Sequence, residues 1–149
     1  MTASQTVVIR PWEPGDDDAL LTGFVDAYNC PPWNDAWTPA TAAAYLGELR
    51  GIPRSATLVA IADSQFVGAT TLHARTWQDE SEIYIDEFFV APAAQRRGVG
   101  RALMEGIRAF AADAGIGDLV LLTDRDVPAL EFYRAHGFRE GTRQVFMIG

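Results

Sequence analysis

The spacing of hydrophobic positions predicts strands and helices in alternation along the first third of the chain. Residues 6–10 form a β-branched run that Pro11 ends, which is typical of a strand. Apolar residues then recur every three or four positions over residues 16–28 and 38–49, and this period predicts two helices. Between them, residues 30–37 contain two prolines and two tryptophans and are expected to form a loop.

The rest of the pattern predicts a meander of three strands, followed by helix, strand, helix and strand. These elements are expected at residues 57–62, 66–73, 83–90, 100–114, 118–123, 129–136 and 145–148. A polar stretch, residues 75–81, is expected to connect the last two strands of the meander. The apolar run 119–122 suits a strand that is buried on both faces and parallel to residues 83–90. We therefore predict an α/β fold that contains a βαβ unit.

Length and composition favour one domain over residues 1–149, inside the cell. A chain of 149 residues can bury one substantial core. No apolar run approaches the roughly 20 residues that cross a bilayer, and the N-terminus has no signal pattern. The single cysteine, Cys30, has no partner for an internal disulfide. We therefore expect a cytoplasmic protein without a membrane partner.

The net charge of −8 is unevenly distributed. Residues 1–90 carry 13 acidic and 4 basic side chains, whereas residues 91–149 carry 7 acidic and 8 basic ones. This division suits an enzyme that takes a cationic amine on one side and a polyanionic cofactor on the other, although acidity that only keeps the protein soluble explains it equally well. Because no basic face is evident, we expect no nucleic-acid partner.

A glycine-containing turn, residues 95–100, follows the strand expected at 83–90 and leads into the next helix. It reads Gln-Arg-Arg-Gly-Val-Gly. The first backbone N–H groups of a helix are unpaired and lie at its positive end, so the turn is a candidate anion site. Gly98 and Gly100 lack a Cβ and let a phosphate approach the backbone. Positive charge comes from three arginines, Arg96, Arg97 and Arg101.

Two common phosphate-binding motifs are excluded at this turn. The chain has no lysine, which excludes the P-loop of nucleoside triphosphatases. The turn also lacks the third glycine of the dinucleotide-binding fingerprint.

Two motifs resemble those of the GNAT family of N-acetyltransferases. Residues 95–100 resemble its Gln/Arg-x-x-Gly-x-Gly/Ala signature. Residues 126–138, Asp-x-x-Ala-x-x-Phe-Tyr-x-x-x-Gly-Phe, are similar to its C-terminal motif, with aspartate where asparagine is usual. The expected order of elements also matches over nearly the whole chain. The resemblance implies a mixed, mostly antiparallel sheet with a splayed parallel strand pair and about four helices on its faces.

The resemblance also implies that acetyl-CoA is the co-substrate. Its pyrophosphate would bind the amides of the turn at 95–100, and its pantetheine would pair with the strand ending at Val90 like an added strand. The residues expected to bind it are Phe88, Phe89, Val90, Gln95, Arg96, Arg97, Gly98, Val99, Gly100, Arg101 and Asp126.

Three residues are candidates for the chemistry that the resemblance implies. Tyr133 matches the general acid of the family and would protonate the thiolate of CoA as it leaves. Glu87 is the favoured base, with Asp86 as the alternative; a salt bridge to an arginine would account for either acid structurally. Because neighbours on a strand lie on opposite faces, only one of the two acids is expected to reach the cleft.

The aromatic loop at residues 30–37 is a candidate rim for the acceptor. Trp33, Asp35 and Trp37 could bind an organic cation together with Glu87, or the tryptophans could pack on the sheet. His73 could reach the cleft or fill a structural role. With two separated histidines and one cysteine, we expect no metal site.

We therefore expect an N-acetyltransferase that uses acetyl-CoA and acts by direct attack of a primary amine. The acceptor is expected to be a small cationic amine, similar to a polyamine or an aminoglycoside. Two alternatives remain open, a protein lysine or N-terminal acetyltransferase acting on peptides, and a catalytically silent acyl-CoA-binding regulatory domain. A homodimer is possible, but no interface is evident in the sequence.

Overall fold

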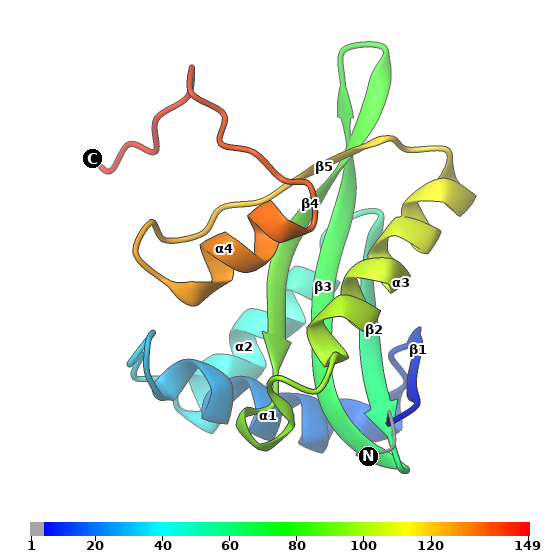
Figure 1. Cartoon of the computed structure of the whole chain (residues 1–149), viewed down its shortest axis with the longest axis vertical. Helices are drawn as coiled ribbons and strands as arrows, with labels where there is room; N and C mark the ends of the chain where they lie inside the picture. Colours follow the sequence, from blue (N-terminus) through cyan, green and yellow to red (C-terminus); the bar gives the residue numbers. More distant parts are fainter. Residues whose placement is uncertain (1–4) are drawn as a thin grey trace.

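The computed structural model describes residues 5–149 and contains one five-stranded sheet (Figure 1). Residues 1–4, part of the segment expected to carry no signal pattern, lie outside the described residues. The strands follow one another in sequence order across the sheet, and all neighbours are antiparallel except the last pair. They are β1 (Val7–Pro11), β2 (Ser55–Ala62), β3 (Gln65–Trp77), β4 (Glu80–Val90) and β5 (Asp118–Val120).

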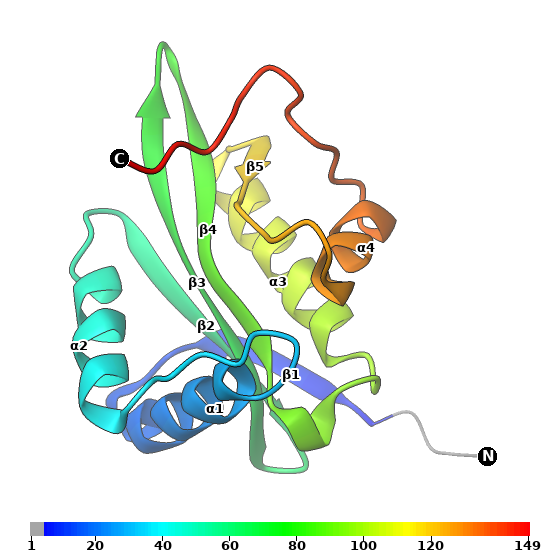
Figure 2. The same cartoon turned by 90° about the vertical axis from the view of Figure 1, so that its left-hand side faces the viewer.

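Four helices cover the two faces of this sheet, which confirms the predicted fold class. Figure 2 shows α1 and α2 on one side of the strands and α3 and α4 on the other. Their bounds are Asp17–Asn29 for α1, Pro39–Arg50 for α2, Val99–Ala114 for α3 and Pro128–Ala135 for α4. Two 3-10 turns, Pro14–Asp16 and Pro92–Ala94, precede α1 and α3. None of the helices within residues 5–149 is long and apolar enough to cross a membrane.

Each face of the sheet has its own hydrophobic core. On one face, Phe24 of α1 and Leu46 of α2 pack with Val59 and Phe89. On the other face, α3 buries an apolar stripe against β2, β3 and β4. This stripe includes Met104 and Ile107, each at most 1% exposed. The sheet is therefore a rigid layer between two cores, and residues at the end of β4 are positioned by both.

Local sequence signals fix the helix ends that matter for the site. Thr38 caps α2 by accepting a hydrogen bond from the Thr41 amide, and Pro39 occupies the first turn. The ends of α3 are set by two glycines in the left-handed conformation, Gly98 with φ of 81° and Gly115 with φ of 70°. Because Gly98 ends the turn that follows β4, the first amides of α3 lie just beyond that turn.

The path of β4 has two irregularities. Opposite β3, Thr71 pairs with Glu87 and Leu72 pairs with Ile85, so Asp86 is the extra residue of a β-bulge. Opposite β5, the pairing is parallel but extends over only three residue pairs, from Glu82 to Tyr84 on β4. Beyond that point β4 has no strand neighbour on its β5 side, which confirms the splayed parallel pair.

Three predictions about local structure were wrong. The strand expected at 118–123 ends at Val120, and Leu122, expected to be buried on both faces, is 63% exposed. Residues 75–81 are not a simple connector, because β3 continues to Trp77 and β4 begins at Glu80, with Arg75 paired to Glu82 across the hairpin at 2.6 Å. Residues 145–148 are not a strand. Their side chains are 72% to 85% exposed, and this end of the chain leads away from the sheet (Figure 1). No neighbouring strand satisfies the backbone of this apolar run, so a strand does not form.

A tight approach between strands generates the first prediction. A Cβ built on Gly68 of β3 would lie 2.7 Å from the Phe89 carbonyl oxygen of β4. We expect Gly68→Ala to lower the free energy of unfolding by about 1–3 kcal/mol, because the backbone must shift to relieve the overlap. The measurement is urea unfolding, with Gly47→Ala as the control. Gly47 lies in α2 with open space around it, so alanine there should stabilise by about 0.5–1 kcal/mol. Equal stability of Gly68→Ala and the parent chain would contradict the close approach.

Candidate functional site

A cavity of about 340 Å³ opens where β4 and β5 part. We call it the β4–β5 cavity. Its walls come from α1 and the loop after it, from the second half of β4, from the segment that follows β5, from α4 and from the C-terminal segment. The lining residues are Tyr28, Trp33, Ile85, Asp86, Glu87, Phe88, Leu121, Leu122, Thr123, Asp124, Ala129, Tyr133 and Phe146.

Both candidate bases line this cavity, which corrects the expectation that only one could reach it. Ile83 and Ile85 belong to the core formed with α3, whereas Phe89 belongs to the core formed with α1 and α2. The odd-numbered residues of β4 therefore face α3 up to Ile85 but face α1 and α2 at Phe89. The bulge at Asp86 causes this change, because an extra residue reverses the alternation of a strand. Asp86 and Glu87 thus lie on the same face of the sheet.

Glu87 is held in an aromatic environment. Its Oε1 accepts a hydrogen bond of 2.6 Å from the hydroxyl of Tyr45 in α2. Burial raises the pKa of the Glu87 carboxyl, and the hydrogen bond from Tyr45 acts in the opposite direction. Its base form is thus stabilised by a phenol donor, without a lysine or arginine beside it. A carboxylate with a raised pKa can take a proton from an amine near neutral pH.

Asp86 pairs with a histidine and not with the arginine considered from the sequence. Its Oδ2 lies 2.7 Å from Nδ1 of His73 on β3, and the two side chains are 9% and 15% exposed. Burial raises the pKa of the Asp86 carboxyl, while the His73 contact lowers it. His73 does not line the β4–β5 cavity; it lies behind Asp86 with its ring 5.6 Å from that of Tyr84. His73 therefore does not reach the cavity itself, but it contacts Asp86, which does.

Tyr133 is nearly buried, on the opposite side of the cavity from α2. It is 8% exposed, and its ring contacts those of Phe88, Phe132 and Phe138. Burial and the charge of Glu87 raise the pKa of the phenol, so it keeps its proton at neutral pH. Among the described residues its hydroxyl has no hydrogen-bond partner. A protonated, unpartnered hydroxyl at a cavity wall has the chemistry of a general acid.

The aromatic loop contributes one of its three predicted residues to the cavity. Trp33 lines the β4–β5 cavity, with its ring 5.9 Å from that of Tyr28. Trp37 stacks on Tyr45 at 5.2 Å and donates through Nε1 to Asp35 at 3.1 Å. Neither Trp37 nor Asp35 lines the cavity, and Trp37 packs against the core of α1 and α2. Trp37 thus follows the packing interpretation, and acceptor binding by Trp33 stays a prediction.

The predicted anion site is an exposed turn at the N-terminus of α3. Arg96 and Arg97 are exposed, whereas Val99 is buried and anchors the first turn of the helix. A Cβ at Gly98 would meet nothing within 4 Å, so the space beside this residue is open. At Gly100 a Cβ would lie 3.2 Å from the ring of Phe132, so this glycine lets α3 approach α4.

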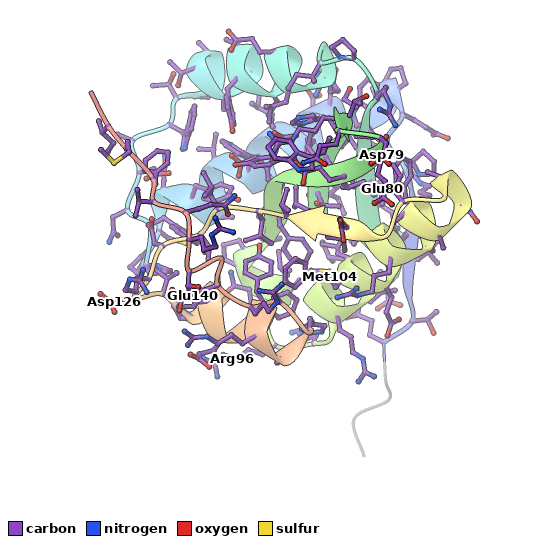
Figure 3. The ribbon with its side chains drawn as sticks, turned by 90° about the horizontal axis from the view of Figure 1, so that it is seen from above. Asp79, Glu80, Arg96, Met104, Asp126 and Glu140 are labelled. Carbon is purple, nitrogen blue, oxygen red and sulfur yellow. The ribbon has the colours of Figure 1, made fainter. Side chains whose placement is uncertain are left out.

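Three further residues of the predicted cofactor set have partners of their own. Gln95 donates from Nε2 to the Val90 carbonyl at 3.3 Å, which ties the turn to the end of β4. Arg101 is exposed and pairs with Glu105 at 3.3 Å. Asp126 is exposed and precedes Val127, the residue at the N-cap of α4. In Figure 3, Arg96 and Asp126 lie on the side of the molecule that carries α4, away from the tip of the β3–β4 hairpin.

The backbone at the end of β4 is paired on one side. Phe88, Phe89 and Val90 pair with β3, and β5 does not reach them. The Phe88 carbonyl accepts a hydrogen bond of 3.2 Å from the Tyr28 hydroxyl. Phe88 itself turns its ring toward Phe132, at 5.5 Å. The free side of this strand end is the surface that an extended ligand could follow.

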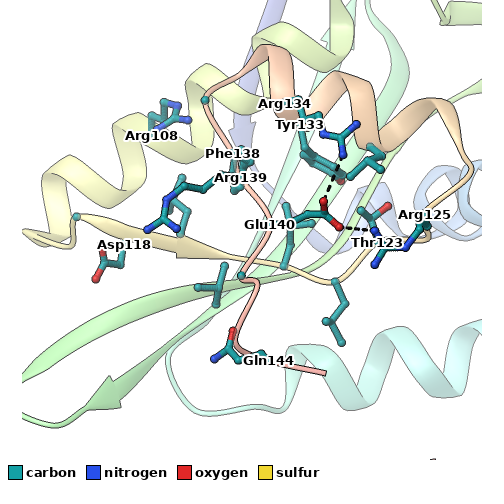
Figure 4. A pocket seen from close by; sticks show the side chains of 18 residues that line it. Arg108, Asp118, Thr123, Arg125, Tyr133, Arg134, Phe138, Arg139, Glu140 and Gln144 are labelled. Atoms are coloured by element: carbon teal, nitrogen blue, oxygen red, sulfur yellow. Dashed lines mark hydrogen bonds and ion pairs between the residues drawn. The ribbon is translucent and has the colours of Figure 1, made fainter. Parts of the chain in front are cut away.

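A second, larger cavity of about 590 Å³ lies between β5, α4 and residues 137–144 (Figure 4). Its polar side chains are largely occupied with one another: Glu140 pairs with Arg125 at 2.5 Å and with Arg134 at 3.4 Å. It shares Tyr133 with the β4–β5 cavity but contains neither Glu87 nor Asp86. The smaller cavity is therefore the candidate site, because it alone brings together the possible base and the possible acid.

Two functional side chains were missed in the sequence. Tyr28 and Tyr45 were expected only as apolar residues of two helical stripes, yet Tyr45 donates to Glu87 and Tyr28 donates to the Phe88 carbonyl. The sequence signal was that each of the two apolar helical faces contains a tyrosine. A buried tyrosine hydroxyl needs a polar partner across the core. No group of three or more His, Cys, Asp or Glu side chains that could hold a metal occurs within residues 5–149.

Comparisons with known proteins agree with this geometry. A model of the acetyltransferase (GNAT) family matches residues 20–138. The mycothiol acetyltransferase of Pseudarthrobacter chlorophenolicus is 34% identical over 139 residues, which are 89% of this chain and 42% of that protein. The aminoglycoside N(6')-acetyltransferase type 1 of Stenotrophomonas maltophilia is 33% identical over 95 residues, 60% of this chain and 62% of that protein. The chain thus spans less than two thirds of the length of these relatives.

Solved structures share the fold. An aminoglycoside N-acetyltransferase in complex with CoA superposes with a TM-score of 0.77, over 100% of this chain and 98% of that one, at 17% identity. A probable acetyltransferase superposes with a TM-score of 0.80, over 95% and 97% of the two chains, at 20% identity.

The contact between Tyr45 and Glu87 generates the second prediction. Tyr45→Phe removes a donor that lowers the pKa of Glu87, so the pKa of this carboxyl should rise further above its ordinary value. The measurement is a carbon-detected NMR titration of the Glu87 carboxyl. Tyr84→Phe is the control, because its hydroxyl makes no hydrogen bond to Glu87. An unchanged or lowered pKa in Tyr45→Phe would show that the hydrogen bond does not stabilise the carboxylate.

Proposed function

Because the chain belongs to the acetyltransferase (GNAT) family, we propose that it transfers an acetyl group from acetyl-CoA to a primary amine. One observation carries the proposal. The β4–β5 cavity brings Glu87, a carboxylate with a raised pKa, and Tyr133, a protonated phenol, to one space beside the free edge of β4. Direct transfer to an amine needs one group of each kind.

The chain has a surface that fits the co-substrate. The space beside Gly98 at the start of α3 is open, and the preceding Arg96 and Arg97 are exposed. The free side of β4 at Phe88–Val90 leads from this turn toward the β4–β5 cavity. When bound, acetyl-CoA supplies an activated thioester carbonyl.

In the proposed reaction Glu87 takes a proton from the incoming ammonium and leaves a neutral amine. The nitrogen attacks the thioester carbonyl carbon, a carbon–nitrogen bond forms, and the carbon–sulfur bond breaks. Tyr133 donates its phenolic proton to the departing sulfur, and the phenolate takes back the second proton that the nitrogen loses as the amide forms. The products are an amide and a free thiol, and Glu87 later releases its proton to solvent. The raised pKa of Tyr133 keeps this proton in place until the thiolate develops.

The acceptor that we propose is a small cationic amine. Asp86, Glu87 and Asp124 line the β4–β5 cavity, and no arginine or histidine does so within residues 5–149. Trp33 lines the same cavity, so the loop after α1 narrows it on the acceptor side. This supports a small molecule over a protein substrate, which would need a wider groove. The aminoglycoside and streptothricin acetyltransferases among the relatives are named for small amines of this kind.

The third prediction tests the reaction and its acid. We expect saturable release of free thiol from acetyl-CoA with at least one member of a panel of polyamines, aminoglycosides and amino acids. Tyr133→Phe and Glu87→Gln should each lower kcat by about 100-fold or more, because each loses one proton transfer. Thiol release is followed with a chromogenic disulfide, and binding of CoA is measured separately by calorimetry. Tight CoA binding without acetylation of any amine would instead favour a binding-only regulatory domain.

The fourth prediction concerns the turn before α3. The double variant Arg96→Ala/Arg97→Ala should raise KM for acetyl-CoA about tenfold with little change in kcat, because these exposed side chains lie at the proposed phosphate site and do not line the β4–β5 cavity. The affinity of the variant should also depend less on salt. Arg143→Ala, an exposed arginine in the C-terminal segment, is the matched control. An unchanged KM in the double variant would move the phosphate site elsewhere.

A further inference from the structure

We propose that Asp86, held in place by His73, binds a second ammonium group of the acceptor, so that the substrate of the β4–β5 cavity is a short diamine. The inference rests on the proposed acetyltransferase function and deepens it. It assigns Asp86 as the residue that determines specificity and His73 as a positioning residue. The acceptor class comprises amines with two cationic nitrogens a few bonds apart, whether aliphatic or part of an aminocyclitol ring.

The first support comes from the β-bulge. It places two carboxylates at the cavity wall, although one carboxylate would be enough to act as the base. Asp86 and Glu87 are consecutive, so their Cα atoms are about 3.8 Å apart, and both line the same cavity. A regular strand would have turned Asp86 to the other face of the sheet. The second carboxylate therefore faces the acceptor as a consequence of an irregular backbone.

The second support is the different bonding of the two acids. Glu87 accepts its hydrogen bond from a phenol, that of Tyr45, and this leaves the carboxyl able to take and release a proton. Asp86 is met by His73, whose Nδ1 is 2.7 Å from Oδ2, and the Asp86 side chain is 9% exposed. Within the described residues, Oδ1 of Asp86 has no hydrogen-bond partner. This oxygen can accept a hydrogen bond from an ammonium group while Oδ2 stays bound to His73.

The third support is independent of the acids. The side chain of Tyr133 lines the same cavity at 8% exposure, and its hydroxyl has no partner among the described residues. An unpartnered hydroxyl on a cavity wall is available to a ligand. Between the two ends, Tyr28, Trp33 and Phe88 offer aromatic faces to the carbon chain and to the cationic groups of a diamine.

Charge favours the same ligand. A monoamine that loses a proton to Glu87 would leave the ionised Asp86 facing a cavity that has no basic lining residue within residues 5–149. His73 occupies Oδ2 only, so a second ammonium would give Oδ1 a charged donor as well. The diamine thus satisfies both acids at once, one by proton transfer and one by an ion pair.

The test compares matched amines in the acetyl-CoA assay. Putrescine is paired with butylamine, and deoxystreptamine with cyclohexylamine, so that the two arms separate an aliphatic from a cyclic diamine. We expect the parent chain to prefer one diamine over its monoamine by at least tenfold in kcat/KM. Asp86→Asn should remove most of this preference, chiefly through a higher KM for the diamine.

Two further variants separate positioning from folding and from net charge. His73→Phe should weaken the diamine preference in the same direction as Asp86→Asn, whereas His73→Asn, which can still donate to Asp86, should restore part of it. Asp79→Asn removes the same charge at the tip of the β3–β4 hairpin, far from the site (Figure 3). It should leave kcat/KM unchanged for both the diamine and the monoamine. Thermal unfolding of each variant checks that the fold is retained.

The outcomes are distinguishable. Equal kcat/KM for diamine and monoamine in the parent chain overturns the inference and leaves the proposed function intact. An Asp86→Asn variant that lowers kcat/KM equally for both substrates also overturns it, because Asp86 would then act in the chemistry or in the fold. Failure to acetylate any amine, despite CoA binding, overturns the proposed function and the inference with it.

Discussion

The short pairing of β4 with β5 is the constraint on which the site depends. Only three residue pairs join the two strands, and beyond Tyr84 the β5 side of β4 is without a strand neighbour. A parallel pair that continued to Val90 would fill the β4–β5 cavity with backbone and would satisfy the groups that an extended ligand could use. Because β3 pairs with β4 along its whole length, the opening costs the sheet no support on that side. The split therefore forms a cavity next to a rigid strand.

Burial of two carboxylates in this opening requires partners from the surrounding elements. Each acid is offset by a different means: Glu87 by the phenol of Tyr45 and Asp86 by the imidazole of His73. Burial keeps the pKa of Glu87 raised although the Tyr45 hydroxyl donates to it. The helix α2 and the strand β3 thus give two neighbouring acids different partners.

The fold could be predicted from the sequence because its signals are local. Helical spacing, the Thr38-Pro39 start of α2 and the glycines around α3 each fix an element independently of the rest. The common face of Asp86 and Glu87 could not be predicted, because the bulge is defined by register with β3 and not by a residue in β4. The strand expected at 145–148 failed for a related reason, since a strand needs a partner that its own sequence does not specify. Similarly, the role of Tyr45 depends on a contact 42 residues away.

The raised pKa values of Glu87 and Tyr133 are linked, and the link has a direction that suits transfer to an amine. The negative charge of Glu87 helps to hold the Tyr133 pKa high. In the proposed reaction Glu87 becomes neutral when it accepts the proton of the amine, so this contribution to the Tyr133 pKa disappears at that moment. The phenol becomes a stronger acid just as the sulfur needs a proton. Proton uptake at one wall of the β4–β5 cavity thereby promotes proton release at the other, without a direct hydrogen bond between the two side chains.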